Sequence, residues 1–103
     1  MFCMTFKEQP TAVGIRIEGR FAGCYAEEAR QSLASCRLDR STTVDISDVT
    51  FADALGEQTL RWLAQCGALF VAQSPYGLHL CESLGLPLLQ IARNNKDGEV
   101  AAD

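Results

Sequence analysis

The sequence predicts one α/β domain with a mixed, mostly parallel sheet of four to five strands and interleaved helices. Residues 2–9 and 12–18 both alternate apolar and polar side chains, and Pro10 separates the two runs, which indicates a β-hairpin. After the hairpin, helical and extended patterns alternate, which indicates crossover connections and parallel strands. A chain of 103 residues fits one domain. We expect that domain over residues 1–93, followed by a polar C-terminal tail over 94–103.

The first crossover is expected to run through a loop at residues 19–23 and a helix at 24–36. The apolar face of this helix repeats at helical spacing, through Ala26, Ala29, Leu33 and Cys36. Residues 43–47 are β-branched at the start and predict a strand that continues extended through 49–51. A second helix is expected from 54 to 66, with an apolar stripe of Leu55, Thr59, Trp62, Leu63 and Cys66.

The last third of the chain repeats the alternation. The continuous apolar run 68–72 predicts a central strand covered on both faces. Ser74 as the cap and Pro75 at the first helical position predict a third helix that ends at Gly85. Its apolar stripe would be Leu78, Cys81 and Leu84. Residues 86–92 fit either a last strand or a short helix.

Composition argues against several classes of function. The net charge of −4 disfavours binding to nucleic acid or anionic lipid, and no stretch approaches the roughly 20 apolar residues of a membrane span. The five cysteines lack a Cys-x-x-Cys pair, so no metal site is expected, and they are interpreted as buried thiols of a cytoplasmic protein. His79 is the only histidine and is expected on an outer helix face. With no acid–base or nucleophile constellation, we expect no enzyme and no cofactor.

One segment carries a family resemblance. Residues 43–56 have the sequence Thr-Val-Asp-Ile-Ser-Asp-Val-Thr-Phe-Ala-Asp-Ala-Leu-Gly, which resembles the core motif of STAS domains, a family that includes the anti-sigma factor antagonists. The segments Cys-Gly-Ala-Leu-Phe-Val (66–71) and Glu-Ser-Leu-Gly-Leu (82–86) are also similar to the family, and the resemblance extends from residue 12 to about 90. It implies a STAS-like fold and a protein-interaction domain. In the antagonists, a partner kinase phosphorylates the serine just before the glycine of this turn.

This sequence departs from the family at that serine. Leu55 occupies the position before Gly56, and Ala54 precedes it, so neither residue has a hydroxyl group. No phosphorylation site is therefore expected at the turn, and the nearest hydroxyls belong to Thr50 and Thr59. Our hypothesis is that the domain keeps the docking scaffold and has lost the phosphorylation switch.

The resemblance implies partner contacts at two segments that would lie at the same end of the domain. These candidates are Arg20, Phe21, Asp53, Ala54, Leu55, Gly56 and Glu57. Asp53 also suits an N-cap. Glu57 either stands in for a permanent negative charge or complements the helix dipole. Phe21 could instead pack in the core, and Leu55 could either be exposed at an interface or fold inward.

The leading hypothesis for function is a non-enzymatic bacterial regulatory module that binds an anti-sigma factor or a kinase-like ATPase. One alternative is a small cytoplasmic STAS-type subunit of a lipid or anion transporter assembly. Another is a small-molecule-sensing STAS domain. In each case we expect no nucleic-acid partner and no direct membrane insertion, and the chain would be a monomer or a weak dimer.

Overall fold

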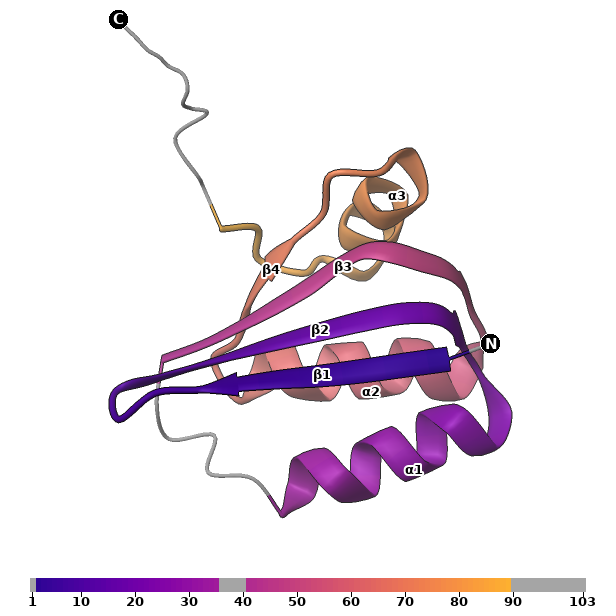
Figure 1. Cartoon of the computed structure of the whole chain (residues 1–103). Coiled ribbons are helices and arrows are strands. Elements are labelled where there is room, and N and C mark those ends of the chain that lie inside the picture. Colours follow the sequence, from indigo (N-terminus) through magenta and orange to yellow (C-terminus); the bar gives the residue numbers. More distant parts are fainter. Residues whose placement is uncertain (1, 36–40, 90–103) are drawn as a thin grey trace, which may run out of the picture.

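The computed structural model describes residues 2–35 and 41–89. Figure 1 shows a twisted sheet, with α1 and α2 side by side along one face and α3 beyond β3. This arrangement confirms the expected α/β class with interleaved helices. The position of Cys36 and the tail expected over 94–103 lie outside the described residues. The elements in chain order are β1 (Phe2–Glu8), β2 (Ala12–Phe21), α1 (Gly23–Ala34), β3 (Ser41–Ala52), α2 (Ala54–Gln65), β4 (Leu69–Val71) and α3 (Pro75–Leu84).

The sheet has the strand order β1-β2-β3-β4. β1 and β2 form the expected antiparallel hairpin, whereas β2 with β3 and β3 with β4 are parallel. Leu88 adds a single parallel bridge to Phe70 on β4, so the described part of 86–92 is extended at this point. The sheet is therefore mixed and mostly parallel, as the alternating sequence pattern predicts.

β2 is longer than expected, and the loop predicted at 19–23 is wrong. The strand continues through Phe21, and Gly19 takes a φ of 89° within it. The pairing of β2 with β3 shifts register between Gly19 and Arg20, which is how a bulge bends a strand without ending it. Arg20 and Phe21 are consequently strand residues, and only Ala22 separates β2 from α1.

The core lies between the sheet and the helices. Alternate residues of β2 and β3 point to this side because the side-chain period of a strand is two. The inward residues of β2 from Val13 to Ile17 and of β3 at Val44 and Ile46 are each at most 2% exposed, and they pack with buried residues of α1 and α2. The main contributors are Val13, Ile15, Ile17, Val44, Ile46, Ala26, Ala29, Leu33, Leu60 and Leu63.

The buried stripe of α2 differs from the predicted one. Thr59 and Leu63 are buried as expected, but Leu55 and Cys66 are exposed, and Leu60 is buried instead. The predicted stripe had the right width but was centred about 60° away around the helix axis. The observed stripe has strict i, i+3, i+4, i+7 spacing at Gly56, Thr59, Leu60 and Leu63. No helix in the described ranges is long and apolar enough to cross a bilayer.

The buried stripe of α3 has the same spacing, with Gly77, Leu80 and Cys81 buried and Leu84 half-buried. Leu78 is exposed, so the prediction that it belongs to the buried stripe is wrong. β4 is also not the doubly covered central strand that we expected. It has three residues at the edge of the named strands, and Leu69 is 38% exposed.

Most of the described cysteines contradict the expectation of buried thiols. Cys3, Cys24 and Cys66 are exposed, because they lie on the open face of β1, in the first turn of α1 and at the C-cap of α2. Cys81 is buried, and this burial raises the pKa of its thiol.

Candidate partner-docking site

The start of α2 is fixed by Asp53. Its backbone is extended, and its Oδ1 accepts a hydrogen bond of 2.9 Å from the backbone N–H of Gly56. The backbone N–H of Glu57 donates to the carbonyl of Asp53 at 2.8 Å and closes the first helical turn. Residues 54 and 55 are therefore held at the first positions of a capped helix, as the sequence predicts.

Asp53 also joins the start of α2 to the start of α1. Its Oδ2 accepts a 2.9 Å hydrogen bond from the backbone N–H of Gly23. The bonds from Gly56 and Gly23 hold the pKa of Asp53 below its ordinary value, because both stabilise the charged form. Since both oxygens accept backbone bonds, the carboxylate acts as a structural clamp between the starts of α1 and α2.

Gly56 allows α2 to approach β2 closely. A Cβ built at this position would lie 2.1 Å from the carbonyl oxygen of Phe21, so only glycine fits there without movement. The side chain of Phe21 is fully buried. This burial corrects the expectation of a partner contact at Phe21, which packs in the core. Gly56 is likewise buried, and its role is to let the backbones meet.

The exposed side chains at this end of β2, β3 and α2 are Arg20, Phe51, Ala54 and Leu55, and we call this set of residues the turn surface. Leu55 is 42% exposed and Phe51 is 40% exposed, while Ala54 is also exposed. Arg20 is exposed and pairs across the sheet with Phe51, and its Cζ lies 4.7 Å from the centre of the phenyl ring. This distance is that of a cation–π contact. Of the two positions open for Leu55, the structure selects the exposed one.

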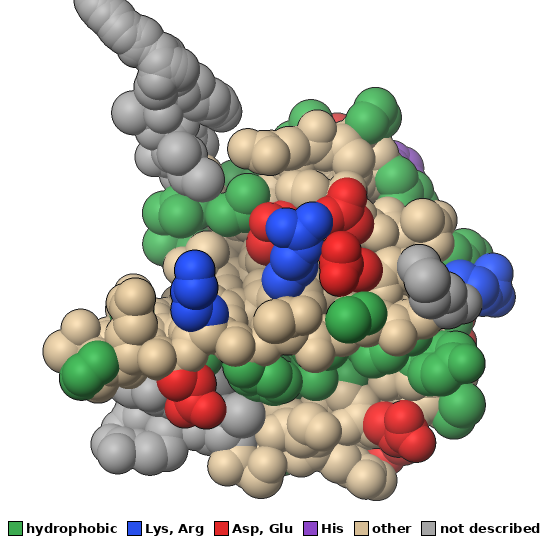
Figure 2. Space-filling model, viewed as in Figure 1, with side chains coloured by type: hydrophobic (Ala, Val, Ile, Leu, Met, Phe, Trp, Pro, Cys, Tyr) green, Lys and Arg blue, Asp and Glu red, His purple; other side chains and the backbone are tan. Residues whose placement is uncertain are grey.

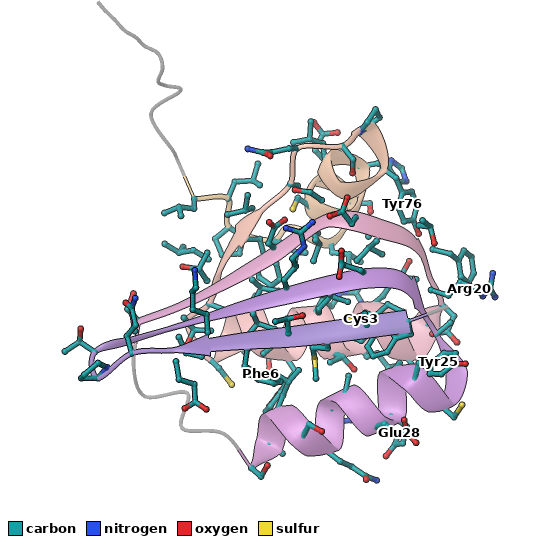
Figure 3. All side chains as sticks on the ribbon, viewed as in Figure 1. Cys3, Phe6, Arg20, Tyr25, Glu28 and Tyr76 are labelled. Carbon is teal, nitrogen blue, oxygen red and sulfur yellow. The ribbon has the colours of Figure 1, made fainter. Side chains whose placement is uncertain are left out.

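Two aromatic residues frame this end of the domain (Figure 3). Tyr25 is 42% exposed, and its ring stacks on that of Phe2 with centroids 5.5 Å apart. The hydroxyl of Tyr76 accepts a 2.9 Å hydrogen bond from the backbone N–H of Ala52. Helix α3 is therefore tied to the end of β3, one residue before Asp53. The position of the turn surface is thus set by elements on both sides of it.

Phe51, Gly23 and Tyr76 belong to this site but were not predicted from the sequence. Phe51 lies beside Arg20 because of the parallel register of β2 with β3, which local sequence patterns do not determine. The other two contacts join residues 30 and 24 positions apart in the chain. No local pattern encodes such a contact.

The two hydroxyl groups nearest the turn differ in exposure. Thr59 is 3% exposed, and its hydroxyl donates to the carbonyl of Leu55 at 2.9 Å. Thr50 is exposed on β3, before the helix begins. Glu57 lies in the first turn of α2 and is half-buried. Within residues 2–35 and 41–89, no cluster of three or more potential ligands could hold a metal ion.

No family model matches this chain, and no curated protein matches it. Among solved structures, an anti-sigma factor antagonist from Mycobacterium paratuberculosis has a TM-score of 0.73 and 17% identity, covering 88% of this chain and 87% of that one. The anti-sigma factor antagonist SpoIIAA in its unphosphorylated form has a TM-score of 0.71 and 13% identity, covering 87% of this chain and 89% of its own. The chain has a STAS-like fold. The fold resemblance inferred from residues 43–56 is thereby confirmed, and the role of the turn rests on the turn's own residues.

Proposed function

We propose that this STAS-like chain is a non-enzymatic regulatory module that binds a protein partner through the turn surface. Leu55 carries the proposal, since it is 42% exposed on the first turn of a helix fixed by Asp53. At the ends of the neighbouring strands β2 and β3, Arg20 lies over the exposed ring of Phe51. Arginine and aromatic side chains are enriched in the energetically dominant parts of interfaces, and a fixed surface loses little entropy on binding. The likeness to anti-sigma factor antagonists supports the same class of function.

In this proposal, binding does not depend on a phosphate at residues 53–56. The positions between the cap and Gly56 are Ala54 and Leu55, which carry no hydroxyl. The amide of Gly56 is already bonded to the carboxylate of Asp53, so a permanent negative group occupies the helix start where a phosphate would be attracted. The module would thus be held in one binding state.

The proposed partner is an anti-sigma factor or a kinase-like ATPase, and the module itself would be a monomer or a weak dimer. Its setting would be the cytoplasm, where free thiols such as Cys3, Cys24 and Cys66 stay reduced. A second candidate is a subunit that docks on the ATPase of a lipid or anion transporter. The lack of a hydroxyl at Ala54 and Leu55 favours this candidate, because such docking needs no phosphoserine.

The test uses the full chain as bait in a native lysate, with Leu55→Asp as the disrupting variant. Leu69→Asp is the matched control, because Leu69 is 38% exposed and lies on β4, opposite the start of β3. We expect one protein to be retained by the wild type and by the control and to be lost with Leu55→Asp. Its class, a kinase-like ATPase or a transporter ATPase, separates the two candidates. Equal retention of every captured protein by all three baits would contradict the proposal.

A further inference from the structure

The sheet has an open face on the side away from α1 and α2, and this face carries a hollow. Figure 2 shows charged side chains of both signs gathered over the strands on this side. The hollow has a volume of ≈ 500 Å³, within the range of small-molecule sites. All four strands or their ends contribute to it, through residues that include Thr5, Lys7, Gly14, Thr43, Asp45 and Val71. It lies over the first halves of β2 and β3, whereas the turn surface lies at their far ends.

Gly14 is the unusual residue of this hollow. It lies in mid-strand, opposite Lys7 on one side and Thr43 on the other. Glycine in a strand interior is destabilising relative to alanine, so its presence here calls for a structural reason. The backbone gives none, since the φ angle of Gly14 is not positive. Packing gives none either, because a Cβ there would meet Lys7 only at ordinary distances of 3.9 and 4.0 Å. The missing side chain instead leaves the floor of the hollow bare.

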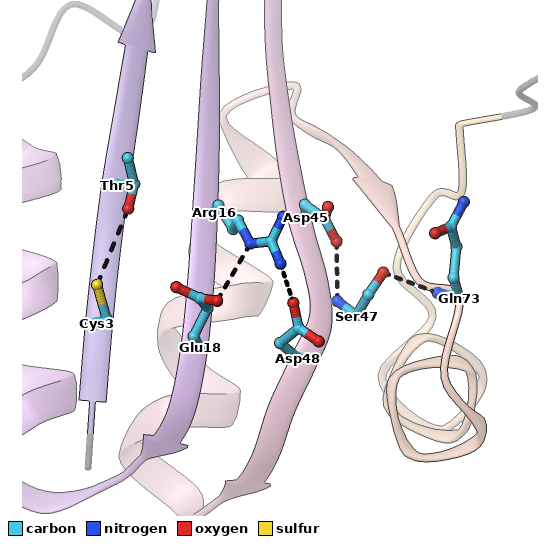
Figure 4. Close-up of polar contacts among 8 residues, drawn as sticks. All are labelled: Cys3, Thr5, Arg16, Glu18, Asp45, Ser47, Asp48 and Gln73. Carbon is cyan, nitrogen blue, oxygen red and sulfur yellow. Dashed lines mark hydrogen bonds and ion pairs between the residues drawn. The ribbon is translucent and has the colours of Figure 1, made fainter.

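The charged groups around the hollow differ in how far they are already paired (Figure 4). Arg16 is held between Glu18, at 3.4 Å, and Asp48. Asp45 accepts the backbone N–H of Ser47 through Oδ1 alone. Lys7, by contrast, forms no ion pair with any residue that the structure describes. Arg16 is thus already neutralised, and Lys7 is the cation available to a ligand.

Lys7 and Asp45 lie on opposite sides of Gly14. Lys7 is on β1 and Asp45 is on β3, with β2 between them. Lys7 pairs with Gly14 and Asp45 pairs with Arg16, so their backbones are two strand spacings apart across the sheet and two residues apart along it, about 12 Å in all. This arrangement suits a flat molecule. Its acidic group would meet the cation, its hydrogen-bond donor would meet the carboxylate, and its flat part would lie over the bare floor between them. Val71 also lines the hollow and supplies apolar contact.

We propose that this hollow binds a small, flat organic carboxylate, with its anionic group on Lys7, its ring over Gly14 and a hydroxyl group donating to Asp45. This site is separate from the turn surface, and its failure would leave the proposed docking function untouched. Substitution of Gly14 by valine fills the floor with a side chain that suits a strand. Substitution of Lys7 by glutamine removes the cation at an exposed position.

The experiment is a titration of the ¹⁵N-labelled chain followed by NMR amide shifts, with 4-hydroxyphenylacetate as the probe. Phenylacetate lacks the donor, and 4-methylphenol lacks the anion. We expect saturable shifts centred on Gly14 and Thr43, with 4-hydroxyphenylacetate binding most tightly of the three. Lys7→Gln should weaken binding by about tenfold or more, because the bond from the charged group is lost. Gly14→Val should weaken it by about the same factor, because the valine side chain fills the floor of the hollow.

The outcomes are decisive in either direction. The proposal is overturned if the three probes produce no saturable shifts around Gly14. It is also overturned if Gly14→Val and Lys7→Gln bind the probe as tightly as the wild type. Lys7→Gln alone carries the test if Gly14→Val does not fold, because the exposed Lys7 side chain makes no contact that the fold requires.

Discussion

Gly56→Ala tests the contact that sets the start of α2 against β2. The added Cβ would lie 2.1 Å from the carbonyl oxygen of Phe21 and 3.2 Å from its carbonyl carbon. The first distance is about 1 Å or more short of van der Waals contact. Overpacking costs about 1–3 kcal/mol, and the obstacle here is backbone, so we take the upper end. Alanine recovers about 1 kcal/mol of helix propensity. The net loss is about 2 kcal/mol of unfolding free energy, or about 10 °C in Tm.

The assay is urea unfolding followed by circular dichroism, with Gly14→Ala as the matched control. A Cβ at Gly14 meets nothing closer than 3.9 Å, so this variant should gain about 0.5–1 kcal/mol. The two Gly→Ala changes are thus expected to move stability in opposite directions. If Gly56→Ala is as stable as Gly14→Ala, the close approach of α2 to β2 is refuted.

Three further predictions concern the residues around the turn. Asp53→Asn should be less stable than the wild type at neutral pH, because an amide cannot accept both backbone bonds. The difference in unfolding free energy should shrink as the pH falls through the lowered pKa of Asp53, and urea unfolding at several pH values will measure it. Tyr76→Phe should cost about 1–3 kcal/mol in the same denaturation assay, because the N–H of Ala52 loses its acceptor. Leu55→Ser should become phosphorylated by a cognate kinase in intact-mass measurements while the wild type gains no phosphate; a stoichiometric phosphate on residues 50–59 of the wild type would contradict the loss of the switch.

The parts of the fold that were predictable are those with local signals. The hairpin around Pro10 follows from two alternating runs, and the caps at Asp53 and Ser74 follow from side chains that bond to nearby amides. The errors arose where tertiary packing decides the outcome. Gly19 suggested a loop but serves as a bulge inside β2. The apolar run of β4 suggested a central strand, yet it lies at the edge and exposes Leu69.

The candidate site was predictable in outline and not in detail. The family resemblance led to the turn, and the cap geometry of Asp53 was foreseeable from its type and position. The sequence left open whether Phe21 is buried and whether Leu55 is exposed, because both depend on how closely α2 approaches β2. The contact of Arg20 with Phe51 needed the strand register, which single-sequence patterns do not supply.

The most direct test of the central claim is the affinity of the purified partner for three chains, measured by isothermal titration calorimetry. Burying a leucine side chain contributes about 1.5–3 kcal/mol, so Leu55→Asp should weaken binding by at least about tenfold. Leu69→Asp should bind as tightly as the wild type. The account is contradicted if Leu55→Asp keeps the wild-type affinity, or if Leu69→Asp loses as much affinity as Leu55→Asp does.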